Sequence, residues 1–352
     1  MSNSAKWAAA SALCLVLEAC QAGKDLEAWS YGDYDPNDPP EIRNIDGDIS
    51  VTDPSLFYWK GTYYVFSSGF SNSGNSGLDL RSSKDLKTFK LEKPLLSPNP
   101  PWVERYLPKV TILWSPYVLA WDGMIHMYYA ASYFGADHAC IGHAATPSMD
   151  KPFVDDGVPL LCSNIGTTDP FIAIDPAVIL DDAGDPWMIF GSGADGINIV
   201  ALDRQGRLDP KSSPQVVAAR TSDDTETIQA ASLNRAPSDA EAIQASSLYH
   251  WRDYYYLFAS YEWPPEHILR VGRAKRVTGP YLDREGRDMA SGGSTLVLQD
   301  SDTFTGPGSN MVFDDGKQRL NVYHAYNATK DIVLRIGQLA FDQDGWPVSA
   351  GP

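Results

Sequence analysis

The sequence predicts an all-β fold and, within that class, a five-bladed β-propeller. A short strand-like run opens a segment of the same design five times, at steps of about 60 to 70 residues. A polar turn and then an aromatic-rich strand follow each run. A unit of this size buries its faces only by stacking on its neighbours, which is the arrangement of a repeat architecture. The five runs begin at Asp53, Ser115, Asp175, Ala245 and Ser309.

Each segment has room for four strands, which is the content of a propeller blade. The aromatic-rich second strands are expected at residues 63–66, 126–129, 187–190, 255–258 and 320–323. Third strands are expected at residues 78–83, 140–145, 197–202, 269–274 and 334–339. Fourth strands are expected at residues 91–96, 158–162 and 295–298, and no amphipathic helix is evident.

The repeats indicate one propeller domain over residues 45–352 of a 352-residue chain that is 43% hydrophobic. A chain of this size and composition can bury a large core. The formal net charge of −17 disfavours nucleic acid and anionic membrane surfaces as partners, because both attract a basic face. We therefore expect a soluble monomer that handles a neutral or cationic ligand.

The first 20 residues differ from the repeats. Lys6 precedes an apolar run over residues 7–17, which is too short to span a bilayer and is typical of a signal peptide. Residues 17–20 (Leu-Glu-Ala-Cys) are similar to a bacterial lipobox, in which Cys20 would carry the lipid. Residues 21–44 are expected to form a flexible linker. We expect an exported protein without an integral membrane span, either a cell-surface lipoprotein or a secreted or periplasmic protein.

Two further cysteines, Cys140 and Cys162, fall in the third and fourth strands expected for the second blade. Early and late positions of an antiparallel hairpin come side by side, so a disulfide is geometrically reasonable. Export would permit it. A pair of buried free thiols is the alternative. Two cysteines without a Cys-x-x-Cys pattern form no zinc site.

The first strand of each propeller blade lines the central channel, and its first residue lies at one mouth of that channel. Asp53 and Asp175 therefore converge at one end of the axis, and each is followed by a proline that fixes the backbone. One Asp-Pro pair alone is usually a strand-entry turn, as we expect for Asp169. Two pairs in register indicate a functional site. We call the five positions the mouth residues: Asp53, Ser115, Asp175, Ala245 and Ser309.

The blade starts carry a recognisable set of segments. They are Asp53-Pro54-Ser55-Leu56, Tyr63-Tyr64-Val65-Phe66, Trp114-Ser115-Pro116, Ala173-Ile174-Asp175-Pro176, Tyr254-Tyr255-Tyr256-Leu257-Phe258, Gly306-Pro307-Gly308-Ser309-Asn310 and Tyr323-His324-Ala325-Tyr326. In this order the set resembles glycoside hydrolase family 43, most closely its arabinan endo-1,5-α-L-arabinosidase branch. The resemblance covers about residues 45 to 349.

The resemblance implies an inverting hydrolase with three carboxyl groups. Asp53 matches the general base that activates water, and Asp175 matches the residue that positions the general acid and tunes its pKa. The acid, a glutamate, is expected one residue before the fourth mouth residue. Inversion needs a base and an acid about 6.5–9.5 Å apart, because water attacks one face while the departing oxygen is protonated on the other.

The chain departs from the family pattern at two positions. Gln244 stands where the acid is expected, and a carboxamide cannot deliver a proton as an acid. Activity is therefore expected to be weak or lost unless Glu241 substitutes. Ser309 stands where family members often carry a histidine near an axial metal or water cluster, and His324 is expected to be packed and hydrogen-bonded. The chemistry requires no cofactor; the metal site is unassigned, and a structural calcium ion stays an open alternative.

Three aromatic residues are candidates for sugar contact. Trp114 at the mouth fits a stacking platform, because the C–H faces of a sugar pack well on indole. Packing between blades is the alternative for this side chain. Tyr117 is a further candidate, and so is Phe70, which lies in a Gly- and Ser-rich loop that is placed to overhang the cleft.

The expected function is hydrolysis of O-glycosidic bonds in arabinan by an endo-1,5-α-L-arabinanase-like enzyme. Its partners would be plant cell-wall arabinan or arabino-oligosaccharides. Two alternatives stay open. The first is a non-catalytic, arabinan-binding propeller that keeps the shape of the site without its proton donor. The second is an exo-acting α-L-arabinofuranosidase or β-xylosidase, which the resemblance implies would share the fold and the carboxylates.

Overall fold

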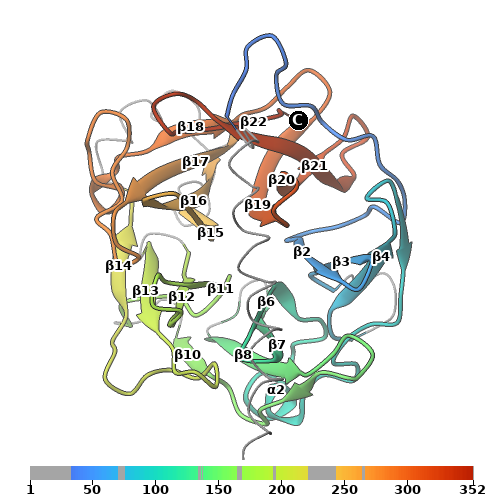
Figure 1. Cartoon of the computed structure of the whole chain (residues 1–352). Helices are drawn as coiled ribbons and strands as arrows, with labels where there is room; N and C mark the ends of the chain where they lie inside the picture. Colours follow the sequence, from blue (N-terminus) through green and yellow to red (C-terminus); the bar gives the residue numbers. More distant parts are fainter. Residues whose placement is uncertain are drawn as a thin grey trace, which may run out of the picture.

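The structure is a computed structural model in which five sheets surround one axis (Figure 1). Each sheet is built on four antiparallel strands that follow one another in chain order, with the first strand nearest the centre. The chain is therefore a five-bladed β-propeller, as its repeats predict. The residues that the structure describes are 33–69, 76–133, 136, 138–164, 169–192, 196–220, 243–263 and 266–351.

The blades have the following strands, from the axis outwards. Blade one contains β2 (Ser55–Trp59), β3 (Thr62–Ser67), β4 (Asp79–Ser83) and β5 (Thr88–Leu91). Blade two contains β6 (Trp114–Trp121), β7 (Met124–Ala131), β8 (His138–Thr146) and β10 (Leu161–Asn164), and β9 (Val154–Asp155) also pairs with β8. Blade three contains β11 (Ala177–Leu180), β12 (Pro186–Phe190), β13 (Ile197–Ala201) and β14 (Gln215–Ala218). Blade four contains β15 (Ile243–Trp251), β16 (Tyr254–Trp263), β17 (Glu266–Ala274) and β18 (Thr295–Leu298). Blade five contains β19 (Thr305–Asp314), β20 (Arg319–Tyr326), β21 (Ile332–Phe341) and β22 (Pro347–Ser349).

All five predicted second strands lie within observed strands, whereas two outer strands differ from the prediction. The strand expected at 91–96 is β5, which ends at Leu91, and the strand expected at 158–162 is β10, which begins at Leu161. Both are four residues long and mostly unburied. Short exposed strands lack the apolar alternation from which a strand is predicted.

The blades pack face to face through their aromatic second strands. Phe66, Tyr129, Phe190, Phe258 and Tyr323 have no exposed surface. Side chains from facing sheets interdigitate to form a continuous core. This packing fixes the inner strands relative to one another, and so it fixes the residues at the mouth of the channel.

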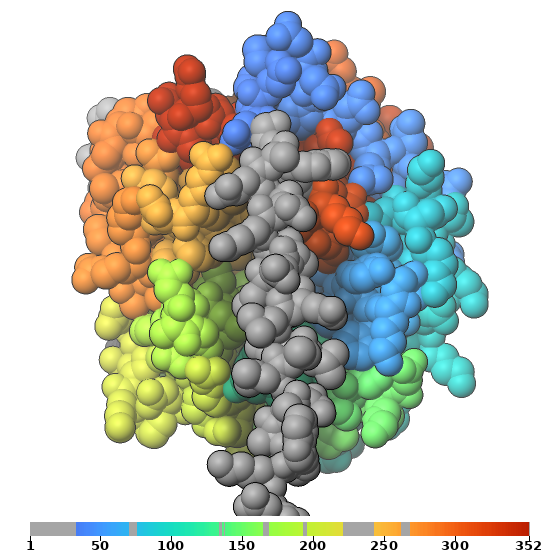
Figure 2. Space-filling model, in the orientation of Figure 1, coloured from blue at the N-terminus to red at the C-terminus, as the bar shows by residue number. Residues whose placement is uncertain are grey.

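The ring closes between the last and the first blade. Figure 2 shows the blades following one another around the rim in chain order, with the red end of the chain beside the blue segment. β19 contacts β2 near the axis. At the rim, β1 (Asp46–Gly47) pairs in parallel with β5, and the Leu334 N–H donates to the Ile49 carbonyl at 2.8 Å.

The N-terminal segment is docked on blade five in the part that the structure describes. The Tyr34 N–H donates to the Phe341 carbonyl at 2.6 Å, and the Arg43 N–H donates to the Ile336 carbonyl at 2.8 Å. Residues 33–43 are thus bound to β21 and do not form a free tether, in contrast to the linker expected over 21–44. Residues 21–32 of that linker and the expected signal peptide lie outside the described residues.

One short helix, α2 (Pro101–Tyr106), was not expected from the sequence. It begins with a proline, whose missing N–H would have no partner at this position anyway. Trp102 is buried and its Nε1–H donates to Asp155 Oδ1 at 3.1 Å. Six residues are too few to display a helical period in the sequence. No helix in the described ranges has the length and apolar character needed to cross a membrane.

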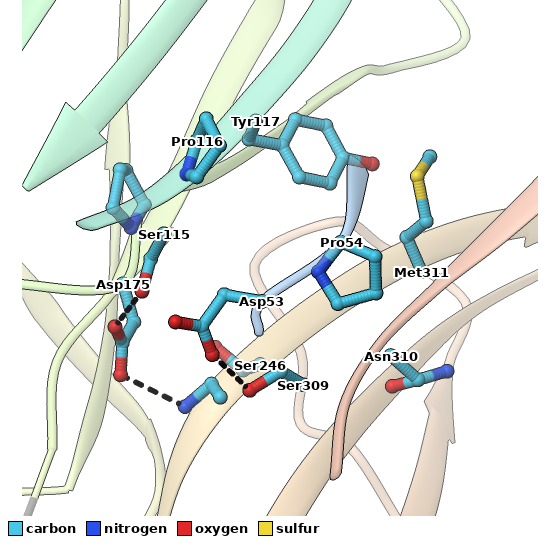
Figure 3. Close-up of a pocket in the computed structure, with 12 residues that line it drawn as sticks. Asp53, Pro54, Ser115, Pro116, Tyr117, Asp175, Ser246, Ser309, Asn310 and Met311 are labelled. Carbon is cyan, nitrogen blue, oxygen red and sulfur yellow. Dashed lines mark hydrogen bonds between the residues drawn. The ribbon is translucent and has the colours of Figure 1, made fainter. Parts of the chain in front are cut away.

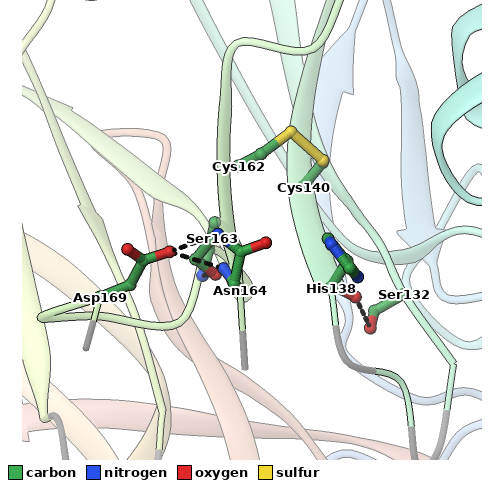
Figure 4. The surroundings of a disulfide bond; sticks show 8 residues. Ser132, His138, Cys140, Cys162, Ser163, Asn164 and Asp169 are labelled. Carbon is green, nitrogen blue, oxygen red and sulfur yellow. Dashed lines mark hydrogen bonds between the residues drawn. A yellow bond between two sulfur atoms is a disulfide. The ribbon is translucent and has the colours of Figure 1, made fainter. Parts of the chain in front are cut away.

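Cys140 and Cys162 form a disulfide bond in blade two (Figure 4). They are direct partners across β8 and β10, with Cα atoms 4.1 Å apart. The disulfide, and not the pair of free thiols, is therefore present. Beside it, Asp169 Oδ2 accepts hydrogen bonds from the backbone and side-chain nitrogens of Asn164 at 2.7 and 3.0 Å.

Candidate active site

The five mouth residues share an uncommon backbone conformation. Their φ angles are 51° at Asp53, 45° at Ser115, 52° at Asp175, 47° at Ala245 and 49° at Ser309. None is a glycine, so each costs about 1–2 kcal/mol relative to ordinary backbone. Backbone strain recurs at the same position of every blade, and the surrounding structure must hold it in place. The strained conformation is therefore a regular feature of the mouth.

The left-handed conformation coincides with irregular strand pairing. In β6, β15 and β19 the register with the second strand shifts next to the mouth residue. A bulge that contains a left-handed residue bends the strand and re-aims a side chain. The mouth side chains consequently gather at the axis, where Figure 3 shows Asp53, Ser115, Asp175 and Ser309 close together.

The Asp53 carboxylate is held by two serine hydroxyls. Ser309, from blade five, donates to Oδ1 at 2.6 Å, and Ser68, from the end of the second strand of blade one, donates to Oδ2 at 2.6 Å. Ser68 Oγ also accepts the backbone N–H of Ser115 at 2.9 Å, so its hydroxyl is fixed in turn. A carboxylate has about four acceptor sites, so the two bonds fix its orientation and leave capacity to bind a water.

The Asp175 carboxylate is held in a similar way by its two neighbouring blades. The Ser115 hydroxyl donates to Oδ1 at 2.6 Å, and the Ala245 backbone N–H donates to Oδ2 at 3.2 Å. Figure 3 draws the bond between Ser115 and Asp175. Each of the two aspartates therefore receives the hydroxyl of a serine mouth residue on an adjacent blade.

These residues line a small axial pocket. Its volume for the centres of water molecules is about 30 Å³, and one water needs about 10–15 Å³ on that measure. The pocket therefore has room for water beside the two carboxylates. The lining residues are Asp53, Pro54, Ser115, Pro116, Tyr117, Asp175, Pro176, Ala245, Ser246, Ser309, Asn310 and Met311.

Tyr117 lines this pocket and also packs against the apolar cores between several blades. Burial raises the pKa of Tyr117 far above its usual value, so its hydroxyl stays protonated. This environment is that of a packed side chain. Its contact with a sugar remains a prediction.

Gln244 and Trp114 both immediately precede a mouth residue and are partly exposed. The Ser192 hydroxyl donates to Gln244 Oε1 at a long 3.4 Å. Gln244 therefore lies next to the mouth residue Ala245, and its place as the counterpart of the general acid remains a prediction. The stacking role of Trp114 remains a prediction. Glu241 and Phe70 lie outside the described residues, so their roles also remain predictions.

Sequence reasoning missed two of the groups that hold Asp53. They are Ser68 and His324, whose Nδ1 accepts the Asp53 backbone N–H at 3.1 Å. His324 was expected to be packed and hydrogen-bonded, but its partner was not foreseen. In the portion that the structure describes, no group of three or more His, Cys, Asp or Glu side chains is arranged to hold a metal ion. A structural calcium ion on the axis stays an open alternative.

Comparison with protein families gives a match over most of the chain. Residues 44–347 match the family described as glycosyl hydrolases family 43. A Cellvibrio japonicus extracellular exo-α-(1→5)-L-arabinofuranosidase is 32% identical over 315 residues, which are 85% of this chain and 86% of that protein. A Bacillus subtilis extracellular endo-α-(1→5)-L-arabinanase is 28% identical over 304 residues, which are 84% of this chain and 86% of that protein.

Solved structures give the same result. An endo-arabinanase from Bacillus licheniformis superposes with a TM-score of 0.74 at 29% identity, over 87% of this chain and 99% of that one. A Cellvibrio cellulosa α-L-arabinanase in complex with arabinohexaose also has a TM-score of 0.74, at 30% identity, over 87% of this chain and 96% of that one.

Proposed function

This chain belongs to family 43 of the glycosyl hydrolases and is a glycoside hydrolase, and from that premise we propose that it cleaves 1,5-linked α-L-arabinan with inversion. Its relatives are named arabinanases and arabinofuranosidases, and one structural neighbour holds arabinohexaose. The observation that carries the proposal is the pair of aspartates at equivalent mouth positions, each bound by a serine of an adjacent blade.

Asp53 is the general base of the proposed reaction. Its carboxylate removes a proton from a water molecule as the water oxygen attacks the anomeric carbon of an arabinose unit. The bond from that carbon to the departing sugar oxygen breaks, and this oxygen leaves with the electron pair. The two serine bonds keep the carboxylate in one orientation, which matters because a displacement of 1 Å can cost about 10²-fold in rate.

Asp175 is the residue that positions the acid side of the reaction. It accepts hydrogen bonds from Ser115 in blade two and from Ala245 in blade four, so it links the mouth residues on either side of its own blade. A second carboxylate near the leaving group raises the pKa of an acid beside it, because two like charges disfavour each other. In this chain the acid position is occupied by Gln244.

Gln244 leaves the departing oxygen without its proton donor at the expected place. General acid catalysis contributes about 10²–10⁴-fold, and the loss is greatest for a sugar leaving group, whose alkoxide is a strong base. We therefore propose weak activity on arabinan and better activity on glycosides with acidic leaving groups. Glu241 is the proposed substitute donor if the wild type cleaves arabinan efficiently.

The test is product release from linear arabinan by the wild type and by Asp53→Ala. Hydrolysis that the substitution abolishes while the thermal unfolding temperature stays within a few degrees supports Asp53 as the base. Persistent hydrolysis in the variant would contradict it. The anomeric configuration of the first product, followed by ¹H NMR, tests inversion directly.

Gln244 also favours a second candidate, an arabinan-binding propeller without catalysis. In that case calorimetry would show saturable binding of arabino-oligosaccharides with no release of sugar over days. The cleavage mode is read from the products, because an endo enzyme releases a ladder of oligosaccharides and an exo enzyme releases mainly one short product. We propose that the protein is exported, since several relatives are named extracellular. We also propose that Cys20 carries the lipid anchor of a lipoprotein and that the protein is a monomer.

A further inference from the structure

The backbone N–H groups of three mouth residues are bound by a serine or histidine side chain of the preceding blade. The Ser115 N–H donates to Ser68 Oγ at 2.9 Å, and the Ser309 N–H donates to Ser260 Oγ at 2.9 Å. The Asp53 N–H donates to His324 Nδ1 at 3.1 Å. These bonds join blade one to two, blade four to five, and blade five back to blade one.

The three acceptors are equivalent positions of the repeat. Ser68 follows the mouth residue of its own blade by 15 positions (68 − 53), and so does Ser260 (260 − 245). His324 follows Ser309 by the same 15 positions (324 − 309). Blade five therefore uses a histidine where blades one and four use a serine, and it does so at the joint that holds Asp53.

The histidine makes a different bond from the serines. A serine hydroxyl accepts and donates at once, as Ser68 does between Ser115 and Asp53. An imidazole nitrogen that accepts an N–H carries no proton, so the proton of the neutral ring is on Nε2. Asp53 Oδ1 lies 3.8 Å from the same Nδ1, so the ring also faces the carboxylate.

The hydrogen bond from the Asp53 N–H to His324 stabilises a strained backbone conformation. Asp53 is held at a φ of 51°, a strained conformation for a residue other than glycine, and the hydrogen bond to His324 Nδ1 helps to hold it there. Without the acceptor, the Asp53 backbone can relax towards ordinary strand geometry. Such a rotation would carry the carboxylate away from Ser68 and Ser309.

We propose that His324 is a positioning residue for Asp53, which it holds in the strained conformation through Nδ1 in the Nε2–H tautomer. This inference rests on the proposed function, in which Asp53 is the base. A residue of the last blade thereby holds the proposed base, which belongs to the first blade.

Two substitutions separate the hydrogen bond from the bulk of the ring. His324→Asn places an amide oxygen near the position of Nδ1, whereas His324→Gln reaches towards the position of Nε2. His250→Asn and His250→Gln are matched controls, because His250 contacts Tyr255 and Asp182 at another blade interface. The reaction is measured with 4-nitrophenyl α-L-arabinofuranoside, whose leaving group needs no proton donor.

The expected result is that His324→Gln lowers kcat about tenfold or more with little change in KM, as misplacement of a base would. His324→Asn restores kcat to within about threefold, and both His250 variants match the wild type. Equal losses in His324→Asn and His324→Gln at unchanged fold would overturn the role of the Nδ1 bond.

A second measurement does not depend on activity. Long-range ¹H–¹⁵N correlation spectra of the full chain, with the His324 signals assigned by their absence from His324→Asn, report the tautomer. An Nε2–H ring supports the inference, and an Nδ1–H ring overturns it whatever the activity. An Nε2–H ring in a protein without hydrolysis of any arabinoside would refute the proposed function, and the positioning of a base would be refuted with it.

Discussion

Ser309 in the last blade donates a 2.6 Å hydrogen bond to Oδ1 of Asp53 in the first blade. One of the two serine bonds that orient the proposed base therefore crosses the joint at which the ring closes. β19 and β2 meet at this joint, so closure of the ring completes the pair of serine bonds on the carboxylate.

The first prediction concerns Ser309 itself. Ser309→Ala removes a hydrogen bond to a charged group, worth about 1.5–3 kcal/mol, so kcat is expected to fall about tenfold or more. Ser309→Gly removes the same hydroxyl and relieves the strain of the 49° φ. Equal activity losses in both variants, with Ser309→Gly the more stable, are expected from steady-state kinetics and thermal unfolding. Unchanged kcat in both would show that the hydroxyl does not orient the base.

The second prediction isolates backbone strain. Ala245 has a φ of 47° and only a methyl side chain, so Ala245→Gly should lose little packing. Relief of about 1–2 kcal/mol of strain exceeds the entropy cost of glycine, about 0.5–1 kcal/mol, and a net gain of up to about 1 kcal/mol is expected. The control is Ala259→Gly, at a buried position of β16 with ordinary backbone, which should destabilise. Equal destabilisation by both changes, in urea unfolding, would refute the strain.

The third prediction concerns a buried histidine pair between blades two and three. His126 Nδ1 lies 3.0 Å from His143 Nε2, and the His126 ring stacks on the Trp121 ring with the two ring centroids 3.5 Å apart. Burial, with a smaller effect of His143, lowers the pKa of His126 from 6.5 to about 4, while Asp156 and Asp122 oppose this.

Between pH 6.5 and about 4, His126 therefore stays neutral in the folded state, whereas it is protonated in the unfolded chain. Stability from this group is fully present above pH 6.5 and is lost as the pH falls towards about 4, by up to about 3 kcal/mol. His126→Phe keeps the stacking surface and should flatten the dependence of the unfolding temperature on pH over this window. An equally steep curve in that variant would assign the acid sensitivity to other groups.

The fourth prediction concerns the disulfide. Cys140 and Cys162 are 22 residues apart, and closing a loop of that length stabilises by about 3 kcal/mol in the chain-entropy account. The Cys140→Ser, Cys162→Ser double variant should lower the free energy of unfolding by that order while kcat stays unchanged, since the bond joins the outer strands β8 and β10 and not the strand that lines the axis. An equal midpoint of urea unfolding for the oxidised and the double-variant proteins would contradict this.

Much of the architecture is predictable because the aromatic second strands repeat at a regular distance and are buried in every blade. The mouth residues follow from the same register, which brings Asp53 and Asp175 together. The short outer strands and α2 are not predictable, since their side chains are exposed or their length hides any period. Docking of residues 33–43 on β21 depends on backbone hydrogen bonds, which leave no side-chain pattern.

The residues that hold the mouth residues in place were harder to predict from the sequence than the two carboxylates. No residue type signals the left-handed conformation of Asp53 or Ala245, because neither is a glycine. Ser68, Ser260 and His324 share an offset of 15 residues from a mouth residue, and a comparison of all five registers would have exposed it. The hydrogen bonds from Ser115 to Asp175 and from Ser309 to Asp53 join neighbouring blades, so only the three-dimensional structure reveals them.

The central claim is that the base side of the site is intact and that its acid side is compromised at Gln244. The most direct measurement compares wild type and Gln244→Glu on linear arabinan and on 4-nitrophenyl α-L-arabinofuranoside. The account predicts at least about a tenfold gain on arabinan and a change within about threefold on the aryl glycoside, whose departure needs no acid. No gain on arabinan, or an equal gain on both substrates, would contradict it.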